Sequence, residues 1–248
     1  MIDIHFELDK KNRRLLKENK LLKLIYSGYF QIIKKNLSIK KKSKTLEIGS
    51  SGFIKETIPY CITSNLQKEK NDKMIDICEN VYNLKQKKNF LSNIIMVDIF
   101  HHLKFPGLAL NNMHRVLRKG GRIVMIEPAM GIIPRIIYKL FHHEPNGFDI
   151  KIKWNNISKK IPKKNSYFAA QSVTWRAFYN KQLDLRFKYR VKKVECFSDF
   201  AYLGSGGFSY KSLYPLRIFY YIKFIDKILT KISSYFFAAR MLVVLEKI

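Results

Sequence analysis

The first 40 residues have the apolar spacing of an amphipathic helix. Between positions 11 and 36, apolar side chains recur every three or four residues, and lysine and arginine occupy many positions between them. These apolar residues are Leu15, Leu16, Leu22, Ile25, Tyr29, Ile32 and Ile33. A lysine-rich run at 40–44 ends the pattern and has the composition of a solvated linker. We therefore predict one N-terminal helix within 1–40 and a second unit over 41–248.

Seven short apolar segments follow the lysine-rich run. They cover residues 45–48, 60–63, 74–77, 93–97, 122–126, 190–197 and 241–245, and a helical pattern separates the fourth from the fifth. Buried strands that alternate with helices indicate a mostly parallel sheet with helices on both faces. We therefore predict a seven-stranded α/β domain with insertions at 129–188 and 205–238 on its substrate side. The second insertion is expected to be helical, just before the last strand.

The composition limits the class of protein further. The chain has 248 residues, of which 47% are apolar, and this excludes a disordered chain or a coiled coil. Its three cysteines, Cys61, Cys78 and Cys196, are too few and too scattered for a disulfide framework. The N-terminus lacks the pattern of a signal peptide, and no run of about 18 apolar residues predicts a membrane span. We expect a cytoplasmic protein.

The net charge of this basic protein is +28, from 47 lysines and arginines against 19 acidic residues. One interpretation is a drift in composition, because lysine, asparagine and isoleucine all have AT-rich codons. The other is an anionic partner, either nucleic acid or a membrane surface. Residues 210–240 combine many aromatic and aliphatic side chains with lysine and arginine. They are interpreted either as helices that cover the core or as a surface for peripheral association with the inner face of a membrane.

Three motifs at the ends of predicted strands carry candidate chemistry. Residues 47–53 read Glu-Ile-Gly-Ser-Ser-Gly-Phe, and the small residues let a ligand approach the backbone. Residues 97–103 read Val-Asp-Ile-Phe-His-His-Leu, and residues 115–128 run from Arg-Val-Leu-Arg-Lys-Gly-Gly to Glu-Pro. This order of motifs resembles the class I S-adenosylmethionine-dependent methyltransferases. The resemblance implies a Rossmann-like seven-stranded sheet and S-adenosylmethionine as the cofactor.

The resemblance also implies which residues bind the cofactor. These are Glu47, Gly49, Ser50, Ser51, Gly52, Phe53, Asn65, Asp76, Val97 and Asp98. Two of them depart from the family pattern. Ser51 stands where the family has its second glycine, and Asn65 stands where an acidic residue holds the ribose hydroxyls. Since Asn65 lacks the charge, we expect Asn65→Asp to tighten cofactor binding by about 1 kcal/mol.

Histidines at two places are candidate catalytic residues. His101 and His102 follow the fourth predicted strand, where they either act on the substrate or pack in a turn that caps the next helix. His142, His143 and Glu144 follow a helical segment after the fifth strand and are candidates for the same role. A general base assists methyl transfer to a weak nucleophile such as a hydroxyl. A metal site at His142, His143 and Glu144 is not predicted, because two adjacent histidines on a helix point in different directions.

The sequence therefore predicts methyl transfer from S-adenosylmethionine to a small-molecule or glycan/lipid-precursor acceptor. Two segments, 138–145 and 203–209, resemble a bacterial subgroup of these enzymes, some of which are encoded near surface-polysaccharide genes. Two alternatives remain open. The first is a non-catalytic binder of membrane or nucleic acid on a decayed methyltransferase fold, and the second is an RNA methyltransferase.

Overall fold

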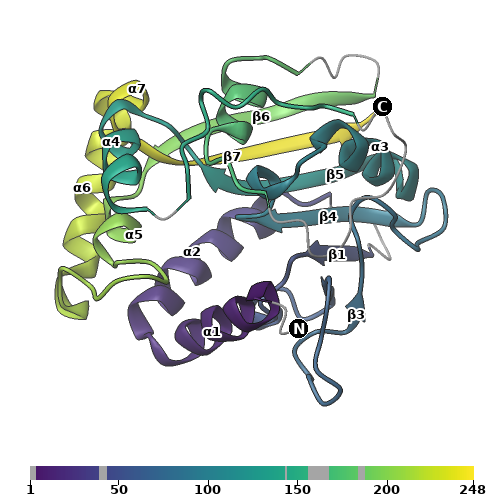
Figure 1. The fold of residues 1–248 in the computed structure, drawn as a ribbon, viewed down its shortest axis with the longest axis horizontal. Coiled ribbons are helices and arrows are strands. Elements are labelled where there is room, and N and C mark those ends of the chain that lie inside the picture. The colour runs from purple at the N-terminus through teal and green to yellow at the C-terminus, as the bar shows by residue number, and fades with distance from the viewer. Residues whose placement is uncertain (1–3, 39–43, 143, 156–167, 184–187) are drawn as a thin grey trace.

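A seven-stranded mixed sheet forms the centre of the computed structural model (Figure 1), which describes residues 4–38, 44–142, 144–155, 168–183 and 188–248. The strands are β1 (Thr45–Ile48), β2 (Cys61–Asn65), β3 (Ile77–Cys78), β4 (Leu91–Val97), β5 (Leu117–Pro128), β6 (Tyr189–Ser198) and β7 (Ala238–Lys247). Their order in the sheet is β3-β2-β1-β4-β5-β7-β6. Strand β7 runs antiparallel to both of its neighbours, and the pairs from β3 to β5 are parallel. The predicted seven-stranded α/β sheet is confirmed.

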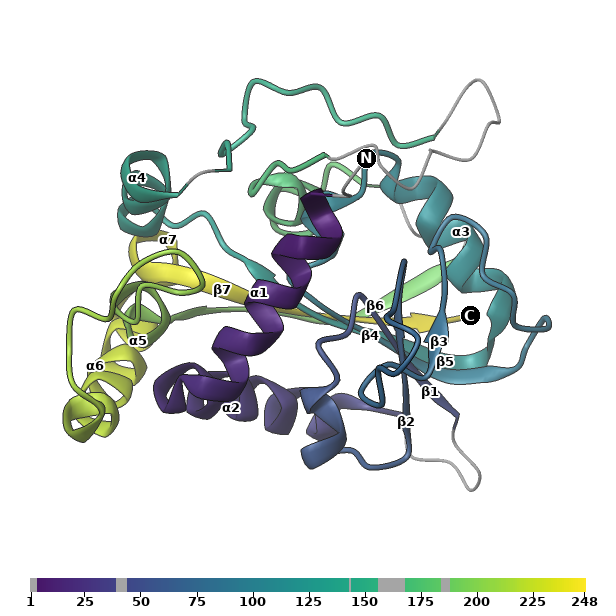
Figure 2. The ribbon, with the colours of Figure 1, turned by 60° about the horizontal axis from the view of Figure 1, so that its bottom comes forward.

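Helices cover both faces of this sheet (Figure 2). Along β5, Ile123 and Met125 belong to one core cluster, whereas Val124 and Ile126 belong to the other. Successive side chains of a strand point to opposite faces, so this alternation creates two separate hydrophobic layers. One layer contains α3 (Pro106–Val116) and the π-helix η3 (Trp175–Tyr179). The other contains α2 (Lys20–Asn36) and residues of α5 (Phe200–Gly204) and α6 (Phe219–Ile232).

The N-terminal segment forms two helices, so the prediction of one continuous helix is wrong. Helix α1 spans Ile4–Glu18 and α2 spans Lys20–Asn36. Asn19 lies between them in an extended conformation, and its side chain accepts hydrogen bonds from the backbone N–H groups of Leu21 and Leu22. Asparagine is among the residues that most favour the start of a helix, because its side chain satisfies these N–H groups. This cap lets α2 pack on the sheet while α1 takes a different direction.

Helical segments also occupy the two predicted insertions. The first contains α4 (Ile132–Phe141) and η3, and the second contains η4 (Leu216–Ile218), α6 and α7 (Ser234–Phe237). Helices α4, α5, α6 and α7 gather at one end of the sheet in both views (Figures 1 and 2). Within the described ranges, no helix combines the length and the apolar character that a membrane crossing requires.

Candidate active site

The turn after β1 is held by local hydrogen bonds at the carboxyl end of the parallel strands. Gly49 and Gly52 have φ angles of +68° and +88°, which glycine adopts more readily than other residues. The buried Ser50 hydroxyl donates to the Glu47 carboxylate and accepts from the Gly52 N–H at 2.8 Å. The Ser50 N–H donates to the Ser64 carbonyl at 2.8 Å. The backbone of this turn is therefore fixed before any ligand binds.

Steric contacts explain why glycine occupies both positions of the turn. A Cβ atom on Gly49 would collide with the side chain of Ile99, and a Cβ atom on Gly52 would lie 2.6 Å from the Cβ of Met74. The small residues and the exact backbone of this turn fit the glycine-rich loop expected to hold the methionine and ribose of S-adenosylmethionine. Burial raises the pKa of Glu47 to about 7, against a lowering by the Ser50 hydroxyl.

Helix α1 supplies a carboxylate next to Asn65, at the end of β2. The Asn65 Nδ2 donates to Asp9 Oδ2 at 2.8 Å and to the Ser50 carbonyl at 3.3 Å. Arg13 lies one helical turn after Asp9, donates to it at 2.7 Å and also forms an ion pair with Asp72. Burial raises the pKa of Asp9, although Arg13 acts in the opposite direction. An acidic group is thus present next to position 65 after all, because Asp9 of helix α1 supplies it.

Sequence reasoning missed Asp9 because 56 positions separate it from Asn65. The only local signal is the spacing of Asp9 and Arg13, which is typical of an ion pair on one helix face. That spacing says nothing about the strand that the helix lies against.

The other predicted cofactor residues lie around the same strand ends. Ser51 is half-buried within the turn, and the buried Phe53 begins the short helix η1 (Phe53–Glu56). Asp76 forms an ion pair with Lys55 at 2.7 Å and accepts from the Thr63 N–H at 2.9 Å. These contacts tie the loop before β3 to the end of β2.

Asp98, directly after Val97 at the end of β4, belongs to a buried polar network. It has a φ of +55°, accepts a hydrogen bond from the Tyr26 hydroxyl at 3.0 Å and forms an ion pair with Arg240. Arg240 is only 1% exposed and also donates to the Tyr29 hydroxyl at 3.2 Å. The side chain of Asp98 therefore anchors α2 and β7 to the end of β4. Nothing in the sequence pattern singled out Arg240 for this role.

His101 and His102 lie in the short 3₁₀-helix η2 (Phe100–His102), and a different acceptor orients each ring. His101 Nδ1 lies 2.7 Å from Glu127 Oε2, at the end of β5. Glu127 is fully buried and also accepts from three backbone N–H groups of the turn and from the Thr174 hydroxyl. His102 Nδ1 lies 3.1 Å from the Phe168 carbonyl oxygen. Both rings are therefore fixed through their Nδ1 atoms.

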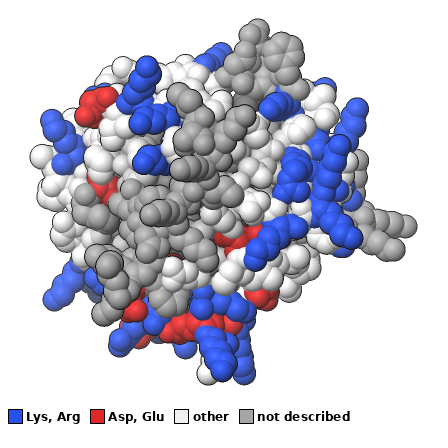
Figure 3. Space-filling view, turned by 45° about the vertical axis from the view of Figure 1, so that its right-hand side comes forward, with Lys and Arg blue, Asp and Glu red and all other residues white. Residues whose placement is uncertain are grey.

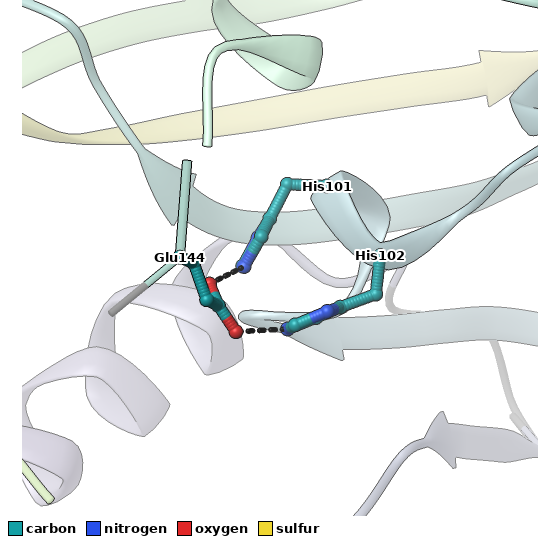
Figure 4. A group of neighbouring side chains, drawn as sticks. All are labelled: His101, His102 and Glu144. Carbon is teal, nitrogen blue, oxygen red and sulfur yellow. Dashed lines mark ion pairs between the residues drawn. The ribbon is translucent and has the colours of Figure 1, made fainter. Parts of the chain in front are cut away.

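The two Nε2 atoms converge on Glu144 (Figure 4). His101 Nε2 lies 3.6 Å from Glu144 Oε2, and His102 Nε2 lies 3.7 Å from Glu144 Oε1. The ring centroids are 4.1 Å apart. His142 lies at the edge of this cluster, where its Nδ1 accepts from the Glu144 N–H at 3.1 Å. His143 lies outside the described residues.

The prediction against a metal site concerned His142 and His143 and did not address His101 with His102. The tight turn η2 places the rings of His101 and His102 side by side, tilted by 39°. The residues His101, His102 and Glu144 are close enough for their ligand atoms to lie within 4.8 Å of one another.

Burial and neighbouring charges separate the two histidines electrostatically. Burial lowers the pKa of His101, but the hydrogen bond and charge of Glu127 outweigh it and raise that pKa to about 10. Burial lowers the pKa of His102 to about 4, and the charge of His101 adds to this effect. The site thus combines a charged, anchored imidazole with a neutral one, which is a suitable arrangement for holding a polar substrate group.

Comparison with known proteins identifies the domain. Residues 55–125 match the family model described as a methyltransferase domain. A methyltransferase dependent on S-adenosylmethionine from Thermotoga maritima has a similar fold, with a TM-score of 0.53, 14% identity and coverage of 96% of this chain and 99% of that one. No curated protein matches the sequence.

Two archaeal structures have the same fold. A methyltransferase dependent on S-adenosylmethionine from Archaeoglobus fulgidus gives a TM-score of 0.51 at 13% identity, covering 99% of this chain and 100% of that one. A chain from the complex of a Haloferax volcanii methyltransferase with its activator Trm112 gives a TM-score of 0.50 at 8% identity, covering 97% of each chain. At these identities the structures show the fold alone, and the family model matches residues 55–125.

Proposed function

Since residues 55–125 match a methyltransferase domain and the sheet has the fold of S-adenosylmethionine-dependent methyltransferases, we propose that the chain methylates a hydroxyl oxygen of a small-molecule acceptor of the glycan or lipid-precursor type. The observation that carries this proposal is the convergence of His101, His102 and Glu144 near the ends of β4 and β5. Bound S-adenosylmethionine supplies an electrophilic methyl group. The residues of the turn after β1, with Asn65 and Asp9 beside it, would hold that cofactor.

The chain's own part in the reaction is positioning and proton uptake. The buried Glu127 fixes His101, and the cluster offers nitrogen and carboxylate atoms to an acceptor hydroxyl. When the oxygen takes the methyl group, its proton passes to the cluster. Holding the two reactants in line accounts for much of the rate of such a transfer.

An exposed apolar face supports a lipid-linked acceptor. Helices α4 and α6 both contact α7, so their outer surfaces are continuous. The exposed apolar side chains on these helices are Ile132, Ile133, Ile136, Leu140, Phe141, Tyr220, Tyr221, Phe224, Ile225, Ile228, Ile232, Tyr235 and Phe236. Of these, Tyr220 and Tyr221 are more than 70% exposed. An apolar patch of this extent is unusual for a surface that contacts only water.

Cations on the same helices suit an anionic lipid surface. Arg135 and Lys139 are exposed on α4, and Lys227 and Lys231 are exposed on α6. Aromatic and basic side chains together are typical of segments that lie at the headgroup layer. We therefore propose that this face docks on an anionic membrane, which brings a lipid-linked acceptor to the strand ends.

The distribution of charge on one face supports this proposal over an RNA substrate. On the face in Figure 3, the lysines and arginines of the described residues lie in several separate groups rather than along one track. A nucleic-acid channel usually presents a continuous basic track.

Two measurements test the proposed function. Calorimetric titration with S-adenosylmethionine should give one binding site, and absence of binding at millimolar cofactor would refute methyl transfer. With a labelled methyl group and a total bacterial lipid extract, label should enter the organic phase. Label that enters added RNA instead would refute the acceptor class.

Vesicle sedimentation tests the docking face. The protein should bind vesicles that contain phosphatidylglycerol and dissociate from them at high salt. It should not bind purely zwitterionic vesicles. Replacing Tyr221 and Phe224 with serine should weaken this binding, whereas Tyr60→Ser, an exposed aromatic before β2, is the matched control. Equal binding by both variants, or no binding by the wild type, would refute the proposal that this face docks on a membrane.

A further inference from the structure

The spacing of the histidine cluster is informative by itself. The distances from Glu144 to His101 and His102, 3.6 and 3.7 Å, exceed the range of about 2.7–3.2 Å for N–H···O hydrogen bonds. Two atoms that bind one tetrahedral ion at about 2.1 Å lie about 3.4 Å apart. These contacts use different oxygens of Glu144, and when each side chain offers one ligand atom the three atoms lie within 4.8 Å of one another. The three side chains thus converge closely enough to surround one shared metal ion.

The surroundings of the cluster match those of metal-binding histidines. Such histidines direct their second ring nitrogen to a carboxylate or a backbone carbonyl, which sets the tautomer and aims the first nitrogen at the metal. Here His101 Nδ1 contacts Glu127, and His102 Nδ1 contacts the Phe168 carbonyl. The Glu144 carboxylate is itself held by Gln171 Nε2. All three ligand groups are therefore oriented by partners outside the cluster.

We propose that His101, His102 and Glu144 bind a divalent transition-metal ion of the zinc type, and that His101 gives up the proton on Nε2 when the ion binds. Two imidazoles and one carboxylate form a ligand set that zinc accepts, with a fourth position for another group. The His101 side chain is 3% exposed and the His102 side chain is 29% exposed, so the cluster is accessible from the His102 side. An ion held here would lower the pKa of an acceptor hydroxyl.

The role of the ion in catalysis rests on the proposed function, whereas its binding does not. His101, His102 and Glu144 would hold the ion, which would supply Lewis acidity that makes the acceptor hydroxyl more acidic. The sulfonium carbon–sulfur bond would break as the carbon–oxygen bond forms, and, because the metal would occupy the cluster, the proton would leave to solvent instead of passing to the cluster. An acceptor with a second oxygen beside the first suits this site, because it chelates the ion.

Cobalt(II) titration tests the site, since its visible absorption reports coordination by nitrogen and oxygen. Metal-stripped wild-type protein should bind one equivalent of Co²⁺, and Zn²⁺ should displace it. His102→Ala and Glu144→Gln should each weaken binding by at least about 100-fold. The matched control is His114→Ala, a histidine of α3 that packs edge-on against Tyr189. Circular dichroism melts of all variants separate loss of ligand from loss of fold.

Each outcome decides the proposal. No uptake of Co²⁺ or Zn²⁺ by folded wild-type protein would overturn it, and so would unchanged affinity in both ligand variants. Calorimetry with S-adenosylmethionine on the same samples separates the two proposals. If the protein binds the cofactor but no metal, only the metal site is refuted. If it binds the metal but no cofactor, only the proposed methyl transfer is refuted.

Discussion

Replacing Asn65 with aspartate tests whether helix α1 completes the cofactor site. The new carboxylate would occupy the place of an amide that donates to Asp9 Oδ2 at 2.8 Å. The hydrogen bond to a charged acceptor, about 1.5–3 kcal/mol, would be lost and replaced by like-charge repulsion. Arg13, which contacts Asp9 at 2.7 Å, offsets part of that repulsion. We expect the free energy of unfolding at pH 7 to fall by about 2 kcal/mol.

The structure thus reverses the expectation from sequence that this substitution tightens cofactor binding. For a chain of 248 residues, a loss of about 2 kcal/mol lowers Tm by roughly 4–8 °C. We also expect weaker binding of S-adenosylmethionine, because α1 is displaced from the end of β2. Thermal melts by circular dichroism and calorimetric titration measure the two effects.

The double variant Asn65→Asp with Asp9→Asn is the decisive control. It exchanges donor and acceptor, so one carboxylate and one amide remain at the same place. Tm and cofactor affinity should both return toward the wild-type values, whereas Asp9→Asn alone should lower both. A single Asn65→Asp variant as stable as wild type, or a double variant no better than the singles, would refute the reasoning.

Three further predictions concern the turn after β1 and the N-terminal helices. Burial raises the pKa of Glu47 to about 7. The contribution of the neutral carboxyl to the free energy of unfolding is therefore fully present below about pH 4.5 and is lost as pH rises through 7. Glu47→Gln should therefore stabilise the protein by up to about 3 kcal/mol at pH 8 and have little effect at pH 4.5, as measured by urea unfolding; equal effects at both pH values would contradict this. Gly49→Ala should cost about 1–3 kcal/mol because of its φ of +68° and the clash with Ile99, whereas Gly28→Ala in α2, with open space around it, should be neutral or stabilising. Asn19→Ala should cost about 1 kcal/mol through loss of the α2 cap, and an unchanged Tm would mean that packing alone starts the helix.

The contact between α1 and the strand ends couples stability to cofactor binding. Residues of α1 reach Asn65 and Asp72, which both lie between β1 and β3 in the chain. A change in α1 is therefore expected to alter both stability and cofactor binding. Measuring the two together distinguishes a local effect on the site from general unfolding.

Local patterns determined most of the secondary structure. All seven predicted apolar segments overlap strands, because a buried strand needs a short apolar run that is visible without knowledge of its partners. The glycine turn after β1 could also be predicted from the sequence, since its backbone conformation depends on residues within the turn itself. The division of the N-terminal segment was missed, although the capping preference of Asn19 is itself a local signal.

Tertiary structure alone decided how the site is assembled. Asp9 meets Asn65 and Arg240 meets Asp98 because packing of α1 and β7 brings distant positions together. The cluster of histidines and Glu144 likewise depends on contacts between the end of β4 and the segment after α4. Hydrophobic periodicity is set by neighbours along the chain, so the sequence reveals the elements. Side-chain partners are set by how those elements pack, and their identities become visible only in the folded protein.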